Sequence, residues 1–291
     1  MKVKIKSAFL LIVTVFLWGS SFVFIKLGLE EVAPLTLGLL RFAIATPFLL
    51  LLVGLTSGFE GLFKGWRQML ILGLTGVTAY HAFQNIGMTM TSASESSIII
   101  ASNPILIALC SWYFLKEKIS RIGAAGIILA FLGVVTIVAR SGLSLGYSSM
   151  LGNLLCMGSV FSWTAYSVYG KQKLREASAN EITAYSSLFG AILLAPPALI
   201  LEGLKFPTST VPWVSLLALG FLCSGIAYLF WYKALEDLPA SEAGSYLFLI
   251  PVIASTLAYF VLGERLDPTF FFGASLVIAG VIMTTRSHHS S

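Results

Sequence analysis

Long apolar segments and short polar ones alternate along the whole chain. Ten apolar stretches can be read between residue 8 and residue 286, and a helix needs about 20 apolar residues to cross a bilayer. Barrel strands cross with only about 10 residues, so the length of these stretches favours helices. The pattern predicts an all-α membrane protein with ten transmembrane helices, at residues 8–28, 35–56, 68–88, 93–115, 121–140, 149–170, 181–201, 212–234, 239–262 and 268–286.

The composition agrees with this pattern, since 57% of the residues are hydrophobic and only 11% are charged. Soluble domains carry roughly 25% charged residues, so there is too little charge here to cover a water-facing surface. A soluble enzyme, a nucleic-acid-binding protein and a secreted disulfide scaffold are thereby excluded. Cys110, Cys156 and Cys223 stand singly in apolar stretches, which favours buried small residues over a metal or redox site.

The positive charges predict how the chain is oriented. With the N-terminus inside, thirteen of the eighteen Lys and Arg residues fall in cytoplasmic segments, four fall outside and Arg41 lies within a span. Positive residues gather in cytoplasmic loops, so we expect both termini in the cytoplasm and the chain in the plasma membrane. The basic start at Lys2, Lys4 and Lys6 resembles a signal peptide. The apolar stretch after it is long enough to span, however, and no small-x-small cleavage site closes it, so we expect it to be retained.

The two halves of the chain repeat one another at offsets of 145 to 148 residues, so that Trp18 corresponds to Trp163 and Tyr80 to Tyr228. Each half holds five predicted spans, and an odd number of crossings turns the second half upside down. The sequence therefore predicts two inverted five-helix repeats, residues 1–141 and 142–286, with a polar tail at 287–291. At an offset of 147 the match pairs Ala93-Ser94-Glu95 with Ala240-Ser241-Glu242, Pro104 with Pro251, Leu115-x-Glu117-Lys118-Ile119 with Leu262-x-Glu264-Arg265-Leu266, Gly126 with Gly273 and Gly133 with Gly280.

Inverted repeats around a site at mid-membrane are the architecture of secondary transporters. Two units that rock against each other open a central cavity to either side in turn, which is alternating access. A passive facilitator or pore can share this symmetry, and a non-transporting membrane sensor is a further alternative. Ten spans can enclose a cavity within one chain, so we expect a functional monomer.

The repeated motifs also resemble a known family. A Trp followed eight residues later by Lys in the first span of each half, and the Pro of span four followed by Leu-x-Glu-[Lys/Arg]-[Ile/Leu], are similar to EamA-type carriers of the drug/metabolite transporter superfamily. The resemblance covers about residues 8–286. It implies a ten-helix carrier with cytoplasmic termini and a central cavity. Members of the family often export amino acids or other small metabolites, and some import them.

A narrower resemblance concerns the aromatic-amino-acid exporters of this family. They carry a Tyr-His pair in span three and a Trp in span six, where this chain has Tyr80-His81 and Trp163. The resemblance implies that these three residues line the substrate cavity.

Motifs for enzymes and for ATP-driven pumps are absent from the sequence. It contains no G-x-x-x-x-G-K-[ST], no H-E-x-x-H and no G-x-S-x-G. His288 and His289 belong to the polar tail, and one remaining histidine cannot make a metal site alone. We therefore expect no enzymatic activity, no cofactor and no metal, and only a small-molecule substrate and the lipid bilayer as partners.

Polar residues within span three are the first candidates for a substrate site. A charged side chain inside a span costs roughly 2.5–3.5 kcal/mol or more, so polar and ionisable residues there are functional by default. His81, Gln84 and Asn85 fall on or beside one face of the predicted helix and are expected to line the cavity. The alternative is a histidine tied to a neighbouring helix. His81 corresponds to Leu229 in the other half, and such asymmetry suits a site for an asymmetric substrate.

Asn103 and the two prolines of spans four and nine form a second group. Asn103 corresponds to Ile250, so it is expected to line the cavity for the same reason. Pro104 and Pro251 each remove a helix hydrogen bond at matching depths. They are candidate hinges, or simple kinks without ligand contact.

Aromatic residues of spans one, six and eight form the third group. Rings at mid-depth can stack on a flat substrate or hold a cation. The alternatives are the interfacial aromatic belt and plain packing. The candidates for the cavity are Trp18, Trp163, Tyr166, Tyr228 and Trp231.

Four charged positions complete the candidates. Glu95 and Glu242 begin spans four and nine, as caps or as protonatable gates. Without an ATP site, uphill export needs an ion gradient, and we expect His81, ahead of Glu95, to carry a coupled proton; the alternative is facilitated transport. Arg41 can extend outward, pair with Glu30 or Glu31, or reach the cavity, and Glu117 is expected in a surface ion pair.

Overall fold

The computed structural model describes residues 2–56, 58–59, 65–90, 96, 99–138, 147–262 and 268–287. These residues are mostly helical and contain no strand, which confirms the all-α class. The elements are α1 (Lys2–Gly28), α2 (Pro34–Thr56), α4 (Trp66–Gly73), η1 (Leu74–Ala79), α5 (Tyr80–Met90), α7 (Asn103–Cys110), η2 (Ser111–Leu115), α8 (Arg121–Val138), α9 (Tyr147–Lys173), α10 (Ala179–Pro197), η4 (Ala198–Glu202), α11 (Thr210–Leu217), η5 (Ala218–Ile226), α12 (Ala227–Asp237), α13 (Ala240–Ser245), η6 (Tyr246–Phe248), α14 (Leu249–Leu262) and α15 (Pro268–Ser287).

Several of these helices have the length and apolar character of membrane spans. Within the described ranges six qualify: Lys4–Gly28, Pro34–Thr56, Ala179–Glu202, Thr210–Asp237, Ala240–Leu257 and Pro268–Arg286. The apolar helices Asn103–Leu115 and Arg121–Ile137 are shorter. The segment from α4 to α5 is less apolar because it carries His81, Gln84 and Asn85. The chain is therefore a multi-pass membrane protein, while the number of ten crossings stays a prediction.

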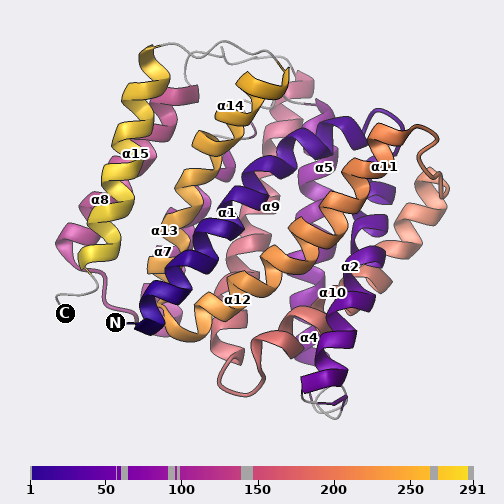
Figure 1. Ribbon diagram of the computed structural model, residues 1–291, viewed down its shortest axis with the longest axis horizontal. Helices are drawn as coiled ribbons and strands as arrows, with labels where there is room; N and C mark the ends of the chain where they lie inside the picture. The colour runs from indigo at the N-terminus through magenta and orange to yellow at the C-terminus, as the bar shows by residue number, and fades with distance from the viewer. Residues whose placement is uncertain are drawn as a thin grey trace.

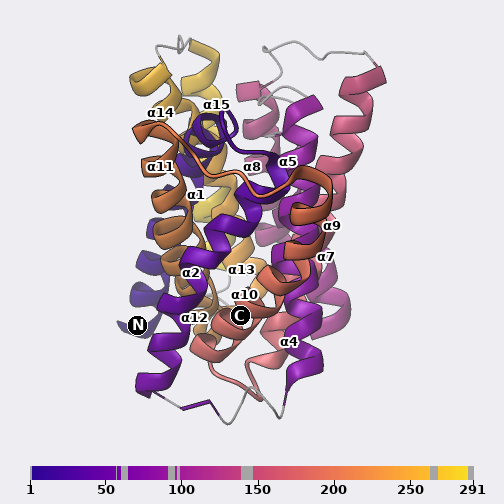
Figure 2. The ribbon, with the colours of Figure 1, turned by 90° about the vertical axis from the view of Figure 1, so that its right-hand side faces the viewer.

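The helices run side by side as one bundle (Figures 1 and 2). α8 and α15 stand together at one edge, and α1 begins on the side of the molecule where α15 ends (Figure 1). Large apolar side chains cover much of the outer surface, as lipid contact requires; examples are Phe9, Phe16, Leu55, Leu154, Phe161, Ile200 and Phe271.

α8 and α15 pack backbone to backbone through glycines. A Cβ atom on Gly133 would lie 2.6 Å from the carbonyl oxygen of Gly273, and one on Gly126 would lie 2.7 Å from that of Gly280. The earlier glycine of α8, Gly126, contacts the later glycine of α15, Gly280, and Gly133 contacts Gly273, so the two helices are antiparallel. Only glycine allows this approach, because any side chain would meet main-chain atoms.

Helices from the two halves of the sequence alternate in the bundle. α1 packs against α12 and α14, α2 against α10 and η5, and α5 against α9. The main hydrophobic core consequently draws on both halves, with Val15, Leu37 and Leu72 from the first and Leu216 and Leu235 from the second. A cavity at the centre of this bundle is bounded by both halves of the chain.

Carboxylates cap helix N-termini across the two halves. The side chain of Glu117 accepts hydrogen bonds from the backbone N–H of Ala240 (2.7 Å) and of Ser241 (3.0 Å) at the start of α13. Glu202 accepts in the same way from Leu35 (2.9 Å) and Thr36 (2.7 Å) of α2. Free N–H groups and the helix dipole favour a carboxylate at these positions. Glu117 thus caps a helix, and the surface ion pair expected for it is wrong.

Candidate substrate cavity

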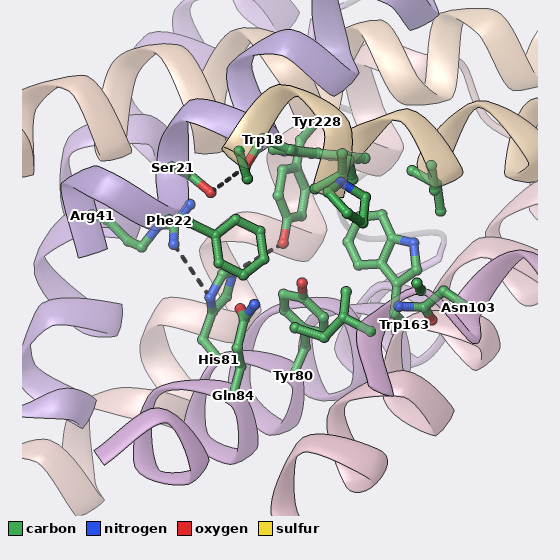
Figure 3. A pocket seen from close by; sticks show the side chains of 16 residues that line it. Trp18, Ser21, Phe22, Arg41, Tyr80, His81, Gln84, Asn103, Trp163 and Tyr228 are labelled. Atoms are coloured by element: carbon green, nitrogen blue, oxygen red, sulfur yellow. Dashed lines mark hydrogen bonds between the residues drawn. The ribbon is translucent and has the colours of Figure 1, made fainter. Parts of the chain in front are cut away.

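A cavity lies among the central helices. Figure 3 shows the side chains that surround it, from helices of both halves. The lining residues are Trp18, Ser21, Phe22, Arg41, Tyr80, His81, Gln84, Ile100, Ala101, Asn103, Trp163, Tyr228, Leu247, Ile250, Pro251 and Ala254.

Aromatic residues from corresponding positions of the two halves meet in the cavity wall. The rings of Trp18 and Trp163 are 5.0 Å apart, edge to face. Tyr228 lies 5.7 Å from Trp18, and Tyr80 lies 5.2 Å from Trp163. Aromatic pairs at these separations stabilise one another, so the wall is a fixed apolar surface.

π-helical turns precede both cavity tyrosines. η1 ends at Ala79, directly before Tyr80, and η5 ends at Ile226, two residues before Tyr228. Such turns are rare in proteins as a whole, but many of those that occur lie at functional sites. They rotate the following residues relative to a regular helix. Gly76 of η1 is also where the chain passes the ring of Tyr166, since a Cβ there would lie 2.2 Å from it.

A chain of hydrogen bonds crosses the cavity wall from Arg41 to the backbone of η1. Nη1 of Arg41 is 3.4 Å from Nδ1 of His81, and Nε2 of His81 is 3.0 Å from the hydroxyl of Tyr228. That hydroxyl donates to the carbonyl of Gly76 at 3.0 Å. A guanidinium only donates and a carbonyl only accepts. The direction of the chain is thus fixed at both ends, and it assigns neutral His81 with its proton on Nε2.

Arg41 lines the cavity, although it belongs to the otherwise apolar helix α2. Its side chain is only 2% exposed, its Nε donates to the hydroxyl of Ser224 at 2.7 Å, and its guanidinium lies 5.8 Å from the ring of Phe42. The sequence left three alternatives for Arg41, namely to extend outward, to pair with Glu30 or Glu31, or to reach the cavity. In the structure Arg41 lines the cavity. No sequence signal selects that position, because α2 is apolar all round and nothing fixes its rotation.

The predicted site residues divide into two sets. The structure brings most of them together at the cavity: Trp18, Tyr80, His81, Gln84, Asn103, Trp163, Tyr228 and Pro251. Three lie behind this wall. The side-chain amide of Asn85 donates to the carbonyl of Pro34 at 3.0 Å, and the hydroxyl of Tyr166 lies 3.2 Å from the hydroxyl of Ser186. Trp231 is fully buried, and its ring centre lies 5.7 Å from that of Trp18.

The predicted gate and hinge residues lie in different surroundings. Glu242 is buried in α13, and its Oε2 atom has no hydrogen-bond partner in the described part of the chain. Pro104 is in the first turn of α7, where a proline disturbs no helix hydrogen bond. Pro251 follows the 3₁₀ turn Tyr246–Phe248, which interrupts the helix. Glu95 lies outside the described residues.

Some lining residues could not be picked out from the sequence. Ser21, Phe22, Ile100, Leu247 and Ala254 line the cavity, yet each resembles many other small or apolar residues of a membrane helix. Their position depends on how the helices are rotated, which apolar sequences do not specify.

Known proteins resemble this chain along nearly its whole length. The sequence pattern of the EamA-like transporter family matches residues 5–139 and, a second time, residues 150–286. An uncharacterized transporter of Archaeoglobus fulgidus is 35% identical over 293 residues, which cover 98% of this chain and 99% of that protein. The chain belongs to the EamA-like transporter family. This finding confirms the resemblance carried by the repeated motifs.

Two further likenesses concern other members of the family and the fold. A probable terminal-alkyne amino-acid exporter of Streptantibioticus cattleyicolor is 27% identical over 283 residues, which cover 97% of this chain and 94% of that exporter. A solved crystal structure aligns with a TM-score of 0.85 over 98% of both chains, at 21% identity. The second likeness shows the fold alone. As an EamA-like protein, the chain is a membrane transporter of small molecules rather than an enzyme.

Proposed function

We propose that this EamA-like transporter is a secondary carrier that works by alternating access and exports amino acids or similar small metabolites. The observation that carries the proposal is the central cavity, built from both halves of the chain and lined by five aromatic residues and a few polar ones. Such a cavity suits a small amphipathic substrate. The similarity to a probable amino-acid exporter supports this substrate class.

Inverted repeats are part of this proposal. The family pattern matches the chain twice, and we keep the division into residues 1–141 and 142–286. α8 and α15 occupy corresponding positions in the two halves and pack antiparallel, as inversion requires. An arrangement of ten crossings, with both termini in the cytoplasm and the chain in the plasma membrane, accounts for the charge distribution. A single chain encloses the cavity, so we propose a functional monomer.

Transport in proteoliposomes tests this function. A carrier must exchange labelled substrate against unlabelled substrate on the other side, and the exchange must saturate, whereas a pore does neither. Purified protein is screened with the twenty amino acids and with amphipathic carboxylic acids and amines. Saturable counterflow of at least one of them is expected. A conductance in single-channel recordings without counterflow would indicate a pore, and no movement of any compound would favour a sensor.

Proton coupling through His81 remains part of the proposal. A proton on Nδ1 of His81 would place two cations 3.4 Å apart, because Arg41 donates to that atom. Like charges at this distance repel strongly in a buried site. We therefore expect His81 to take up its proton only when Arg41 has moved away or an anion balances its charge.

Imposed pH gradients test the coupling. Wild type, His81→Gln, Glu95→Gln and Glu242→Gln are compared in proteoliposomes with and without a pH difference. We expect wild type to accumulate substrate beyond equilibrium and His81→Gln to equilibrate it only. Facilitated transport is the correct description if wild type never accumulates substrate. The assignment to these residues fails if all three variants still accumulate it.

A further inference from the structure

Arg41 is a buried cation without a carboxylate partner. It is 2% exposed, and its hydrogen bonds go to a serine hydroxyl and to a neutral imidazole. None of the described acidic side chains forms an ion pair with it; the ion pair in the described ranges joins Lys173 and Glu176 at 2.9 Å. A buried charge without a partner is unfavourable by several kcal/mol, so its presence beside a cavity calls for a ligand of opposite charge.

The guanidinium also has donors to spare. It carries five N–H groups in a planar fork, and its two hydrogen bonds engage Nε and one position on Nη1. Arg41 lines the cavity, so the remaining donors are available to a molecule inside it. A planar carboxylate fits such a fork with two parallel hydrogen bonds, which a single ammonium group cannot match.

The rest of the cavity supplies an apolar body site next to this charge. In Figure 3, Arg41 lies at one end of the cavity, Phe22 and Tyr80 follow it, and the indole rings of Trp18 and Trp163 lie farther along. A ligand with its anionic group at Arg41 would place its body against these rings.

We propose that Arg41 is the carboxylate-binding residue of the transporter and that its substrates are small organic acids or zwitterions with an apolar or aromatic body. This inference rests on the proposed carrier function, since it assigns the substrate class of the same cavity. The neighbouring His81 is then a positioning residue, because its Nδ1 accepts a hydrogen bond from Nη1 and fixes the orientation of the fork.

Three ligands with the same body and different charge test the proposal: 3-phenylpropionate, 3-phenylpropanamide and 3-phenylpropylamine. Their affinities are measured through the tryptophan fluorescence of the full-length protein in nanodiscs. Hydrogen bonds to a charged group are stronger than those between neutral groups, so wild type should bind the acid at least about tenfold more tightly than the amine. Arg41→Gln should remove this preference, and Arg41→Lys should restore part of it. Arg67→Gln, which neutralises an arginine on an exposed part of α4, should leave the preference unchanged.

The outcomes separate this inference from the carrier function. The inference is overturned by wild type alone if it binds the amine as tightly as the acid, or if it does not bind the acid. An acid preference that survives in folded Arg41→Gln overturns it too. If counterflow is present while Arg41→Gln keeps the specificity of wild type, the carrier stands and the carboxylate site is wrong. If the acid preference depends on Arg41 and wild type shows no counterflow, the site stands and the carrier is wrong.

Discussion

At the residue scale, the hydroxyl of Tyr228 is the central link of the cavity wall. It accepts from His81 of α5 and donates to Gly76 of η1, so one side chain of the second half joins two elements of the first. Buried polar groups are stabilised only when all of them are paired. The wall is therefore sensitive to the loss of a single atom.

Tyr228→Phe tests this sensitivity. The variant leaves the Nε2–H of His81 without its partner and removes one hydrogen bond from the carbonyl of Gly76. An unpaired buried polar group costs about 1–3 kcal/mol. We expect a lower melting temperature and a KM for counterflow raised by roughly threefold to tenfold. Tyr232→Phe is the matched control, because its hydroxyl donates to the carbonyl of Tyr166 at 3.0 Å and lies outside the cavity lining. It should lower stability alone, and equal effects on KM in both variants would contradict this role.

The internal repeat of the sequence predicted the aromatic pairs of the cavity, but it did not predict that Arg41 lines the cavity. Trp18 with Trp163, and Tyr80 with Tyr228, occupy corresponding positions, so one half supports the assignment of the other. Arg41 has no such counterpart, since Ser186 stands at the same offset of 145. Its direction depends on the rotation of α2, which packs against α10 and η5 and is decided only in the folded bundle.

At the element scale, the antiparallel contact of α8 and α15 joins the last helices of the two halves. Four glycines bring the two backbones together, and main-chain atoms cannot move aside as a flexible side chain would. The contact therefore tolerates no added volume. Neither helix contributes a residue to the cavity lining, so its role is structural.

Gly133→Ala tests whether the contact between α8 and α15 requires glycine for lack of space, apart from the general effect of glycine on helix stability. Its Cβ would lie 2.6 Å from the Gly273 oxygen and 2.7 Å from the Val277 nitrogen, and overpacking costs about 1–3 kcal/mol. A lower melting temperature in detergent is expected. Gly54→Ala is the control in α2, where the nearest atom belongs to the ring of Phe59 at 3.1 Å. Alanine favours a helix over glycine by about 1 kcal/mol, so this variant should be neutral or more stable, and the reverse order would refute the argument.

The cap that Glu117 provides to α13 makes a second prediction for an element. Glu117→Gln keeps the shape but removes the charge, and the loss of a helix cap costs about 0.5–2 kcal/mol. The first turn of α13 should then exchange its amide hydrogens faster, as measured by mass spectrometry. Glu176→Gln removes a carboxylate that is 62% exposed and pairs with Lys173 on the surface, so exchange in α13 should not change. Unaltered exchange in Glu117→Gln would show that other contacts hold α13.

Helix ranges were predictable from the sequence, but the irregular turns inside them were not. α2 covers Pro34–Thr56, close to the range of 35–56 read from hydropathy. α9 extends to Lys173, beyond the expected end at 170, because polar residues can continue a helix past the apolar stretch. The π-helical turn Leu74–Ala79 contains Gly76, which lies against the ring of Tyr166, a contact between distant parts of the chain. Hydropathy carries no information on such contacts.

At the scale of the whole molecule, loops on one side tie the two halves together outside the spans. The carboxylate of Glu31, between α1 and α2, accepts hydrogen bonds from the hydroxyl of Ser209 and from the backbone N–H of Thr208 at 2.6 Å. The hydroxyl of Ser209, with the backbone N–H groups of both residues, lowers the pKa of Glu31 from 4.5 to about 2. A carboxyl group with a lowered pKa stabilises the folded state in its charged form.

The stability of the protein should therefore fall in acid partly through Glu31. Its contribution is present above pH 4.5, the ordinary pKa, and is lost as the pH falls from there towards about 2. We expect Glu31→Gln to be less stable than wild type at neutral pH and to lose less stability on acidification, as measured by melting temperature in detergent. Glu30→Gln changes an exposed neighbour with the same loss of charge. Parallel acid profiles for wild type and Glu31→Gln would rule out this contribution.

The hydrogen-bond chain through His81 gives the cavity a built-in spectroscopic label. The sequence holds three histidines, and His288 and His289 lie in the tail; replacing these two with asparagine leaves one imidazole in the entire protein. Nitrogen-15 magnetic resonance distinguishes the two neutral tautomers and the doubly protonated ring by their chemical shifts. The substrate-free carrier should give a single pair of signals from the tautomer with hydrogen on Nε2. Each added compound can then be followed at one atom, Nδ1, which reports whether Arg41 still donates to it.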